Sequence, residues 1–193
     1  MTNIKGVINI GAHYAEQYDE WVRAGAKNFL LIESVAKNFM ELNNRFFDKP
    51  NVKLLNMALG NRTGKITMYV DPKHLSFSAS IFKPTEHLKD YPDIEFSDKE
   101  EVDIDKLDNI DYDRTLYDHI YITAQGAELE ILKGATESLK YIKTIKSQVY
   151  RKRLYDGCFI TEELTDYLSG IGFELVKIEP RGISWDHAYY QRK

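Results

Sequence analysis

Short apolar runs alternate with amphipathic stretches over the first third of the chain. Lys5–Ile10 (KGVINI), Asn28–Ile32 (NFLLI) and Asn51–Asn56 are rich in branched apolar residues, which predicts three buried strands. Between them, Tyr14–Ala24 and Val35–Phe46 carry apolar residues at helical spacing. Strands that alternate with helices indicate a parallel sheet with helices on its faces.

The same alternation returns in the second half of the chain. We expect strands at His119–Thr123 and Ile142–Val149, and a helix over Ala127–Leu139 with Gly134 as a weak point. A further helix is expected at Thr161–Ser169, with Thr161 as its cap. A final antiparallel pair is expected at Phe173–Ile178 and Ser184–Gln191.

The middle of the chain is less regular. Gly64–Val70 and Glu101–Ile104 have strand patterns, and they flank a segment of about residues 71–100 that holds three of the five prolines. Such a segment is either a functional loop or a surface insertion, and the sequence leaves both open. Because we find no repeat or linker, we expect one domain over residues 1–193 with a loop-rich insertion at about 71–100.

Composition narrows the class of protein. With 43% hydrophobic residues in 193, the chain has enough apolar material to fold, which excludes disorder as its main state. The formal charge of −4 disfavours a nucleic-acid binder. No apolar run reaches about 18 residues, so we expect no membrane span, and the N-terminus does not resemble a signal peptide. The single cysteine, Cys158, is expected to be an inert buried thiol in a cytoplasmic protein.

The turn after the first strand carries the first chemical signal. Gly11 lets the backbone approach a ligand closely, although the further glycines of a dinucleotide fingerprint are absent. Glu33 ends the second strand, 22 residues after Gly11. An acid at about this distance accepts hydrogen bonds from ribose hydroxyls in nucleotide-binding sheets. Together the two residues favour a binding site for a ligand that contains adenosine. The alternative is that Glu33 is only a solvated glutamate at the end of a strand.

Several segments, in this order, give the chain a recognisable signature. They are NIGAH (Asn9–His13), GAKNFLLIES (Gly25–Ser34), NMALGNRTGKITMYV (Asn56–Val70), SFSASIFKP (Ser76–Pro84), VDIDKLD (Val102–Asp108), QGAELEILKGA (Gln125–Ala135), YLSGIGFEL (Tyr167–Leu175) and WDHAYY (Trp185–Tyr190). The chain resembles the FkbM-type family of S-adenosylmethionine-dependent methyltransferases over nearly its whole length.

The resemblance implies a fold, a cofactor and a reaction. The fold is a class I, Rossmann-like α/β fold: about seven strands, mainly parallel with one antiparallel strand, and helices on both faces. The cofactor is S-adenosyl-L-methionine, and the acceptor is a hydroxyl, often on a sugar or glycan. By analogy the cofactor contacts Gly11, Ala12 and His13 at the methionine part, Glu33 at the ribose, and Ala58 and Leu59 at the adenine, with Ser34 and Gln125 nearby.

The chain also departs from the family pattern at positions that usually carry acids. Thr123 and Gln148 stand where an aspartate and a glutamate are usual, and Asn9 replaces an acid in the first strand. Neither threonine nor glutamine can replace the charge of a carboxylate as a proton acceptor. We therefore retain Thr123 and Gln148 as catalytic positions and add His13, Asp186 and His187 as candidate proton acceptors.

Other residues are candidates for the acceptor site. Ser76, Ser78 and Ser80 could line a pocket or belong to a polar loop. Glu128 either favours a helix N-terminus or contacts substrate, and Tyr150 and Arg151 follow a core strand. No His, Cys, Asp or Glu cluster has metal-ligand spacing, so we predict no metal.

Three functions remain open. The first is an S-adenosylmethionine-dependent O-methyltransferase with a small-molecule or glycan acceptor. The second is a catalytically impaired or non-catalytic protein with the same fold, which the missing carboxylates favour. The third is a nucleotide-dependent oxidoreductase, which the missing glycines disfavour.

Overall fold

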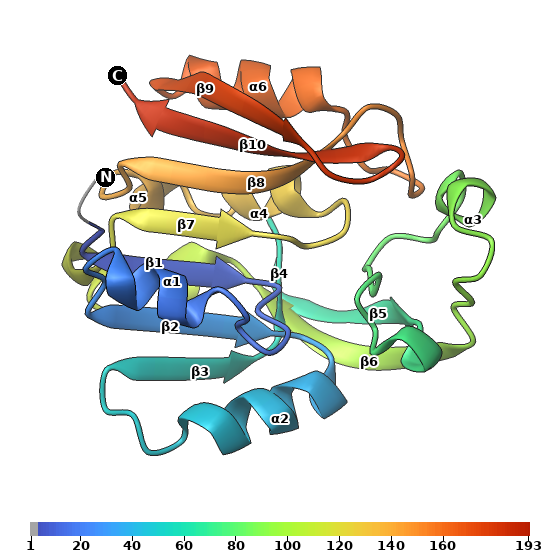
Figure 1. The fold of residues 1–193 in the computed structure, drawn as a ribbon, viewed down its shortest axis with the longest axis horizontal. Helices are drawn as coiled ribbons and strands as arrows, with labels where there is room; N and C mark the ends of the chain where they lie inside the picture. Colours follow the sequence, from blue (N-terminus) through green and yellow to red (C-terminus); the bar gives the residue numbers. More distant parts are fainter. Residues whose placement is uncertain (1–3) are drawn as a thin grey trace.

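A computed structural model describes residues 4–193 of the chain. Its main feature is a seven-stranded sheet in which β10 alone runs antiparallel to its neighbours (Figure 1). The strands, in spatial order, are β3 (Val52–Asn56), β2 (Asn28–Glu33), β1 (Gly6–Ile10), β7 (His119–Ile122), β8 (Thr144–Tyr150), β10 (Trp185–Arg192) and β9 (Phe173–Pro180). This arrangement confirms the expected fold class.

Two apolar clusters cover the two faces of the sheet. The even-numbered side chains of β1 and β2, such as Ile8 and Leu30, pack with Ile131 and Leu164 from the helical side that holds α4 (Glu128–Lys133), α5 (Thr136–Leu139) and α6 (Thr161–Gly170). The odd-numbered side chains pack against α1 (Tyr18–Arg23) and α2 (Ala36–Phe46). Strand alternation therefore divides the core into two layers.

A small second sheet lies beyond the carboxyl ends of the strands. It consists of β4 (Ala58–Leu59), β6 (Asp98–Asp105) and β5 (Gly64–Val70). β4 was not predicted, because two residues are too short to make a pattern. β6 was predicted only at Glu101–Ile104, because the charged residues at its start conceal a strand that is partly exposed.

Residues 71–97, which we call the cap segment, connect β5 to β6. They contain the short helices η1 (Pro72–His74) and α3 (His87–Asp90). The cap segment is joined to the chain after β8, because the N–H groups of Thr85 and His87 both donate to the carbonyl of Leu154 over 3.0 Å. Two further turns, η2 (Leu107–Asn109) and η3 (Arg114–Leu116), precede β7.

Three sequence expectations about helices were wrong in detail. The helix expected from Tyr14 begins at Tyr18, because His13 and Ala15 have φ values of 48° and 51° in the left-handed region. The helix expected over Ala127–Leu139 is two helices, since the chain turns where Gly134 packs on Gly60; a Cβ there would lie 2.0 Å from the Gly60 oxygen. Thr161 is not the cap: Ile160 is, and the Thr161 hydroxyl donates to the Tyr150 carbonyl over 2.8 Å.

Within residues 4–193 no helix has the length and apolar content to cross a bilayer. The expectations of a single domain over residues 1–193 and of a cytoplasmic location stay predictions.

Candidate active site

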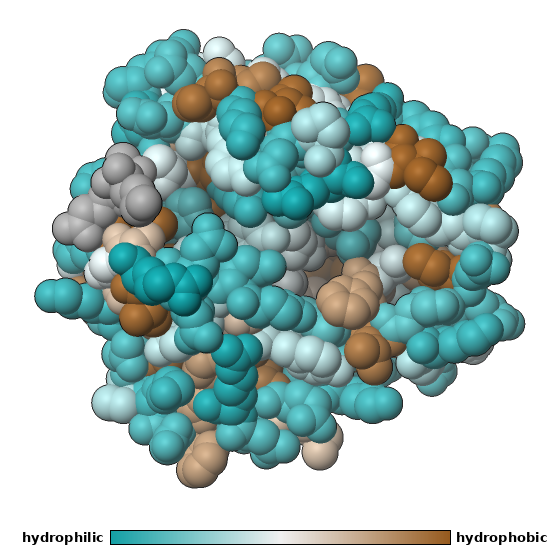
Figure 2. All heavy atoms as spheres, in the orientation of Figure 1, coloured by the Kyte–Doolittle hydropathy of each residue, from teal (hydrophilic) through white to brown (hydrophobic). Residues whose placement is uncertain are grey.

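A cavity of about 570 Å³ lies between the carboxyl ends of the parallel strands and the cap segment. Ligands of open α/β sheets bind at this edge, and the volume is that of a small-molecule site. The surface is hollowed between the main sheet and the part of the molecule that carries α3 (Figure 2). The predicted site residues that line it are Gly11, Ala12, His13, Glu33, Ser34, Ala58, Leu59, Ser76, Ser78, Thr123, Gln125, Gln148 and His187.

The turn after β1 is built on a glycine that no other residue can replace without strain. Gly11 has φ +70°, and a Cβ on it would lie 2.1 Å from the carbonyl oxygen of Thr123. The N–H groups of Gly11 and Ala12 both donate to the carbonyl of Ile32, over 3.0 and 2.9 Å. The turn is thereby held between β2 and β7, with its backbone against the cavity.

Glu33 is a buried carboxylate in the cavity wall. Its Oε2 accepts the His13 N–H and its Oε1 accepts the Val35 N–H, each over 2.8 Å. Burial raises the pKa of this carboxyl, and the two backbone donors oppose the rise. Each carboxylate oxygen has a second lone pair, so Glu33 can still accept a hydrogen bond from each of two vicinal hydroxyls.

His13 joins the turn to the cap segment. Its ring stacks on Phe77 at 4.0 Å between centroids, its Nδ1 lies 2.6 Å from Oε1 of Glu16, and its Nε2 lies 3.2 Å from the carbonyl oxygen of Leu75. Both ring nitrogens therefore face oxygen atoms of neighbouring residues. In this arrangement it has no free nitrogen to accept a proton.

Thr123, Gln148 and His187 follow one another across neighbouring strands at the same edge. Gln148 and His187 are paired in the register of β8 and β10. The Thr123 hydroxyl donates to the Gly11 carbonyl over 3.2 Å, and the Gln148 amide donates to Oε1 of Gln125 over 3.4 Å. Gln125 also donates to the Phe77 carbonyl over 2.9 Å, which links this row to the cap segment.

His187 is the titratable side chain of this row. Burial, reinforced by the positive charges of Lys146 and Arg181, lowers the pKa of its imidazole to about 4. Its Nδ1 is buried and has no hydrogen-bond partner among residues 4–193. Around neutral pH the ring is therefore uncharged, and one of its two nitrogens carries a free lone pair.

Five predicted site residues do not line the cavity, which corrects the sequence analysis on their placement. Ser80, Glu128 and Tyr150 are buried in the structure behind it. Glu128 accepts the N–H groups of Ala124 and Gly126, each over 2.9 Å, and the Tyr150 hydroxyl over 3.0 Å. Burial raises the pKa of Glu128 to about 7. Its carboxyl group serves these three donors and does not line the cavity.

The other two members of that group, Arg151 and Asp186, pair with each other. Nε of Arg151 donates to Oδ2 of Asp186 over 2.9 Å, so these two predicted site residues neutralise each other outside the cavity. The Ser80 hydroxyl donates to the Gln125 carbonyl over 2.7 Å and holds the turn after β7. Ser76 and Ser78, in contrast, do reach the cavity.

Sequence reasoning missed several residues of the wall. Glu16, Gln17 and Asn38 contribute polar groups, and Phe77, His87, Tyr91 and Trp185 contribute rings. Glu16 and Gln17 follow the glycine turn so closely that an expected helix obscured them. The cap-segment aromatics have no regular spacing, because their segment is held by tertiary contacts.

No group of three or more His, Cys, Asp or Glu side chains in residues 4–193 is arranged to hold a metal ion. The prediction that no metal is required stays a prediction. Cys158 is buried, and burial raises the pKa of its thiol, which favours the neutral form. That the thiol is inert stays a prediction.

Known proteins give the cavity a context. The Methyltransferase FkbM domain matches residues 9–175. The 2-O-methyltransferase NoeI of Sinorhizobium fredii (strain NBRC 101917 / NGR234) is 30% identical over 142 residues, which cover 70% of this chain and 58% of NoeI. The crystal structure of methyltransferase FkbM from Methylobacillus flagellatus KT superposes with a TM-score of 0.65 at 16% identity, over 99% of this chain and 44% of that one.

A Streptococcus pneumoniae protein solved in complex with S-adenosyl-L-methionine has the same fold, with a TM-score of 0.54 at 14% identity over 97% of this chain and 67% of that one. The chain thus spans less than two thirds of the length of NoeI and of the FkbM structure. The match to the FkbM domain covers most of the sequence, and the chain belongs to the FkbM methyltransferase family.

Proposed function

We propose that this protein transfers a methyl group from S-adenosyl-L-methionine to a hydroxyl of a sugar or glycan. The observation that carries the proposal is the Glu33 carboxylate, which lines the cavity beside the Gly11 turn and keeps acceptor capacity on both oxygens. Membership of the FkbM methyltransferase family supplies the class of reaction.

The residues around the turn fit the parts of this cofactor. Glu33 suits the two ribose hydroxyls, and the close backbone of Gly11 and Ala12 suits the methionine part. Ala58 and Leu59, which also line the cavity, offer an apolar slot for a flat base. The bound cofactor supplies a methyl group that its positive sulfur already activates, so that much of the catalysis is positioning.

His187 is our proposed proton acceptor. An acceptor oxygen that forms a bond to the methyl carbon gains positive charge, and its proton becomes strongly acidic. A neutral imidazole can then take that proton even with a lowered pKa. Gln148, paired with His187 across the strands, is placed to orient the hydroxyl by a hydrogen bond. The name of NoeI, a 2-O-methyltransferase, supports an oxygen acceptor.

A second function is favoured by one observation: Thr123 and Gln148 line the cavity without the charge that the family usually has there. A protein that binds the cofactor but transfers methyl groups slowly, or not at all, fits that feature. An oxidoreductase that uses a dinucleotide fits less well, because the turn lacks the further glycines.

Two experiments test these functions. Calorimetry with S-adenosyl-L-methionine and with NAD should show binding of the first and none of the second; the reverse result contradicts the proposal. Methyl transfer to a panel of glycosides then separates an enzyme from a binding protein, because only the enzyme yields methylated product.

A further inference from the structure

Two aromatic side chains that are far apart in the sequence line the cavity and both reach one glycine. Tyr91 follows α3 in the cap segment, and Trp185 begins β10; both line the cavity. That glycine is Gly182, in the turn between β9 and β10. A Cβ on Gly182 would lie 2.1 Å from Nε1 of Trp185 and 2.7 Å from the Tyr91 hydroxyl oxygen. Any side chain at residue 182 would collide with both, so glycine at this position leaves room for the two rings.

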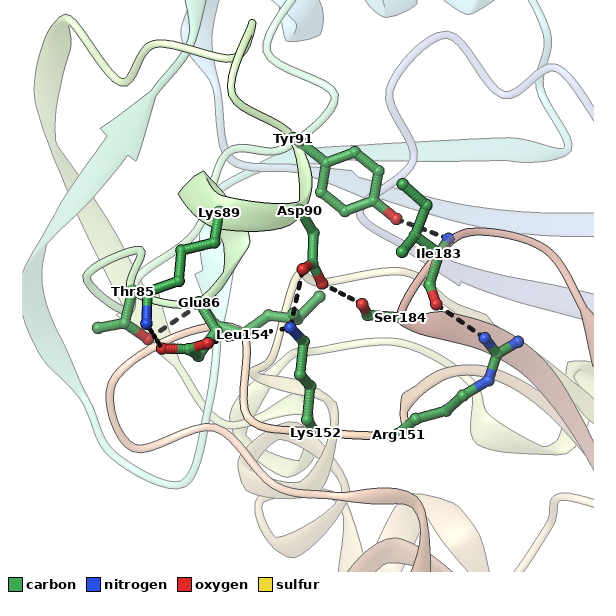
Figure 3. A network of polar contacts seen from close by, with 10 residues as sticks. All are labelled: Thr85, Glu86, Lys89, Asp90, Tyr91, Arg151, Lys152, Leu154, Ile183 and Ser184. Carbon is green, nitrogen blue, oxygen red and sulfur yellow. Dashed lines mark hydrogen bonds and ion pairs between the residues drawn. The ribbon is translucent and has the colours of Figure 1, made fainter.

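Polar contacts join the Tyr91 side of this cavity wall to the β9–β10 turn (Figure 3). The Tyr91 hydroxyl oxygen accepts the N–H of Ile183 over 3.0 Å. The neighbouring carboxylate of Asp90 accepts a hydrogen bond from Lys152 over 2.8 Å and another from the hydroxyl of Ser184. These bonds lower the pKa of Asp90. They tie α3 to the chain after β8 and to the β9–β10 turn, and they hold Tyr91 in place.

The wall adjoins the proposed proton acceptor. The Trp185 ring meets the His187 ring edge to face, with centroids 5.5 Å apart. On the other side, the ring centroids of Tyr91 and His87 are 4.9 Å apart. Burial lowers the pKa of His87 to about 4. The Trp185 end of the wall therefore lies next to His187.

The electrostatics of the wall favour an uncharged ligand. Three cations around the wall are paired with carboxylates: Arg151 with Asp186, Lys152 with Asp90 and Arg181 with Glu179. His87 and His187 are neutral at pH 7 because their pKa values are about 4. A pyranose ring offers a matching surface: an apolar face of C–H groups for an aromatic ring, and hydroxyls at its edge for polar neighbours.

We propose that Tyr91 and Trp185 form an aromatic platform on which a neutral pyranose ring of the acceptor stacks, with one hydroxyl directed at His187. The platform rests on the proposed function, since it is the acceptor half of the same cavity. It assigns acceptor recognition to the cap segment and the β9–β10 turn, apart from the cofactor residues around Glu33.

The test is binding of methyl glycopyranosides (gluco, manno, galacto and rhamno) to the protein by calorimetry, with and without S-adenosylhomocysteine. Trp185→Leu and Tyr91→Leu should each weaken glycoside binding about tenfold, as expected for the loss of one stacked ring. Trp185→Phe should recover most of that affinity. The affinity for S-adenosylhomocysteine should stay within about twofold of the original value.

Two further variants refine the test. Tyr141→Leu removes an exposed ring that does not line the cavity, and it should leave glycoside binding unchanged. Gly182→Ala keeps both rings but displaces them, so it should weaken glycoside binding as the leucine variants do. Thermal unfolding of each variant shows whether it is folded, and the leucine variants decide the matter if Gly182→Ala is not.

Failure of the platform and failure of the proposed function give different results. Absence of S-adenosylhomocysteine binding to the unaltered protein contradicts the proposed function. Unchanged glycoside affinity in both leucine variants overturns the platform, as does the absence of binding by every glycoside in the panel. Binding of a phenol such as 4-nitrophenol in place of the glycosides also overturns it, because a flat aromatic acceptor would then be the better match.

Discussion

The backbone N–H of His13 donates a hydrogen bond of 2.8 Å to Oε2 of Glu33. This bond joins the turn after β1 to the end of β2, and it means that Glu33 organises the turn as well as facing the cavity. The other oxygen, Oε1, accepts the N–H of Val35 at the start of α2 over 2.8 Å. A substitution of Glu33 therefore removes a ligand contact and leaves two backbone donors without their partner.

Glu33→Ala should weaken the binding of S-adenosyl-L-methionine by about 1.5–3 kcal/mol, the range for a hydrogen bond to a charged group. It should also lower the free energy of unfolding, because buried N–H groups lose their acceptor. Calorimetry and urea denaturation measure the two effects. Asp113→Ala is the matched control: its carboxylate also caps a backbone N–H, that of Thr115 over 3.0 Å, but lies outside the cavity. Equal cofactor affinity in folded Glu33→Ala would remove Glu33 from the site.

Gly11→Ala should be among the most damaging single-methyl changes in the chain. The added Cβ would lie 2.1 Å from a backbone oxygen at a φ of +70°, so the turn must shift. We expect a loss of about 1–3 kcal/mol of stability from overpacking and weaker cofactor binding. Gly170→Ala, where a Cβ meets nothing within 4 Å, should have little effect. Similar urea midpoints for both variants would contradict this account of the turn.

Gln148→Glu and Thr123→Asp should raise the rate of methyl transfer if carboxylates at these positions serve as proton acceptors. A general base typically contributes about 10²–10⁴-fold, while cofactor affinity should change little. Each single variant should be measured beside the double variant, since two neighbouring carboxylates repel. A fast unaltered enzyme with no gain in either variant would instead support His187 as the sufficient acceptor.

The pH dependence of the rate tests His187 directly. Its folded pKa of about 4 lies below the usual 6.5, so the imidazole is neutral and able to accept a proton above about pH 5. We expect kcat/KM to fall as the pH drops through about 4 and to show no His187 step near 6.5. His187→Gln should remove that step and lower kcat. His119→Gln is the control, because the pKa of His119 is also about 4 but the residue does not line the cavity. An unchanged pH profile in His187→Gln would exclude His187 as the acceptor.

The main sheet was predictable because each of its strands carries a local signal. Val7, Ile8 and Ile10 mark β1 by their side chains alone, and a parallel sheet buries such runs on both faces. Gly11 and Glu33 were predictable for the same reason: they end strands, and the carboxyl ends of parallel strands form one edge. The departures Thr123 and Gln148 do lie at that edge, where the resemblance placed them.

The residues that sequence reasoning misplaced or missed depend on contacts between distant segments. Glu128 looked like a site residue at a helix start, but it satisfies two backbone N–H groups and the Tyr150 hydroxyl in the core. Tyr91 was missed because its place depends on Gly182 and Ile183, about 90 residues further along the chain. Such pairings cannot be predicted from the periodicity of the sequence, because they form only when the cap segment packs on the β9–β10 turn.

A crystal structure with S-adenosylhomocysteine bound is the most direct test of the central claim, that this cavity is the cofactor site of a methyltransferase. The account predicts both ribose hydroxyls on the Glu33 carboxylate, the amino-acid part along the Gly11–Ala12 backbone, and the sulfur on the side of Gln148 and His187. Ligand bound elsewhere, or in the cavity without contact to Glu33, would contradict it.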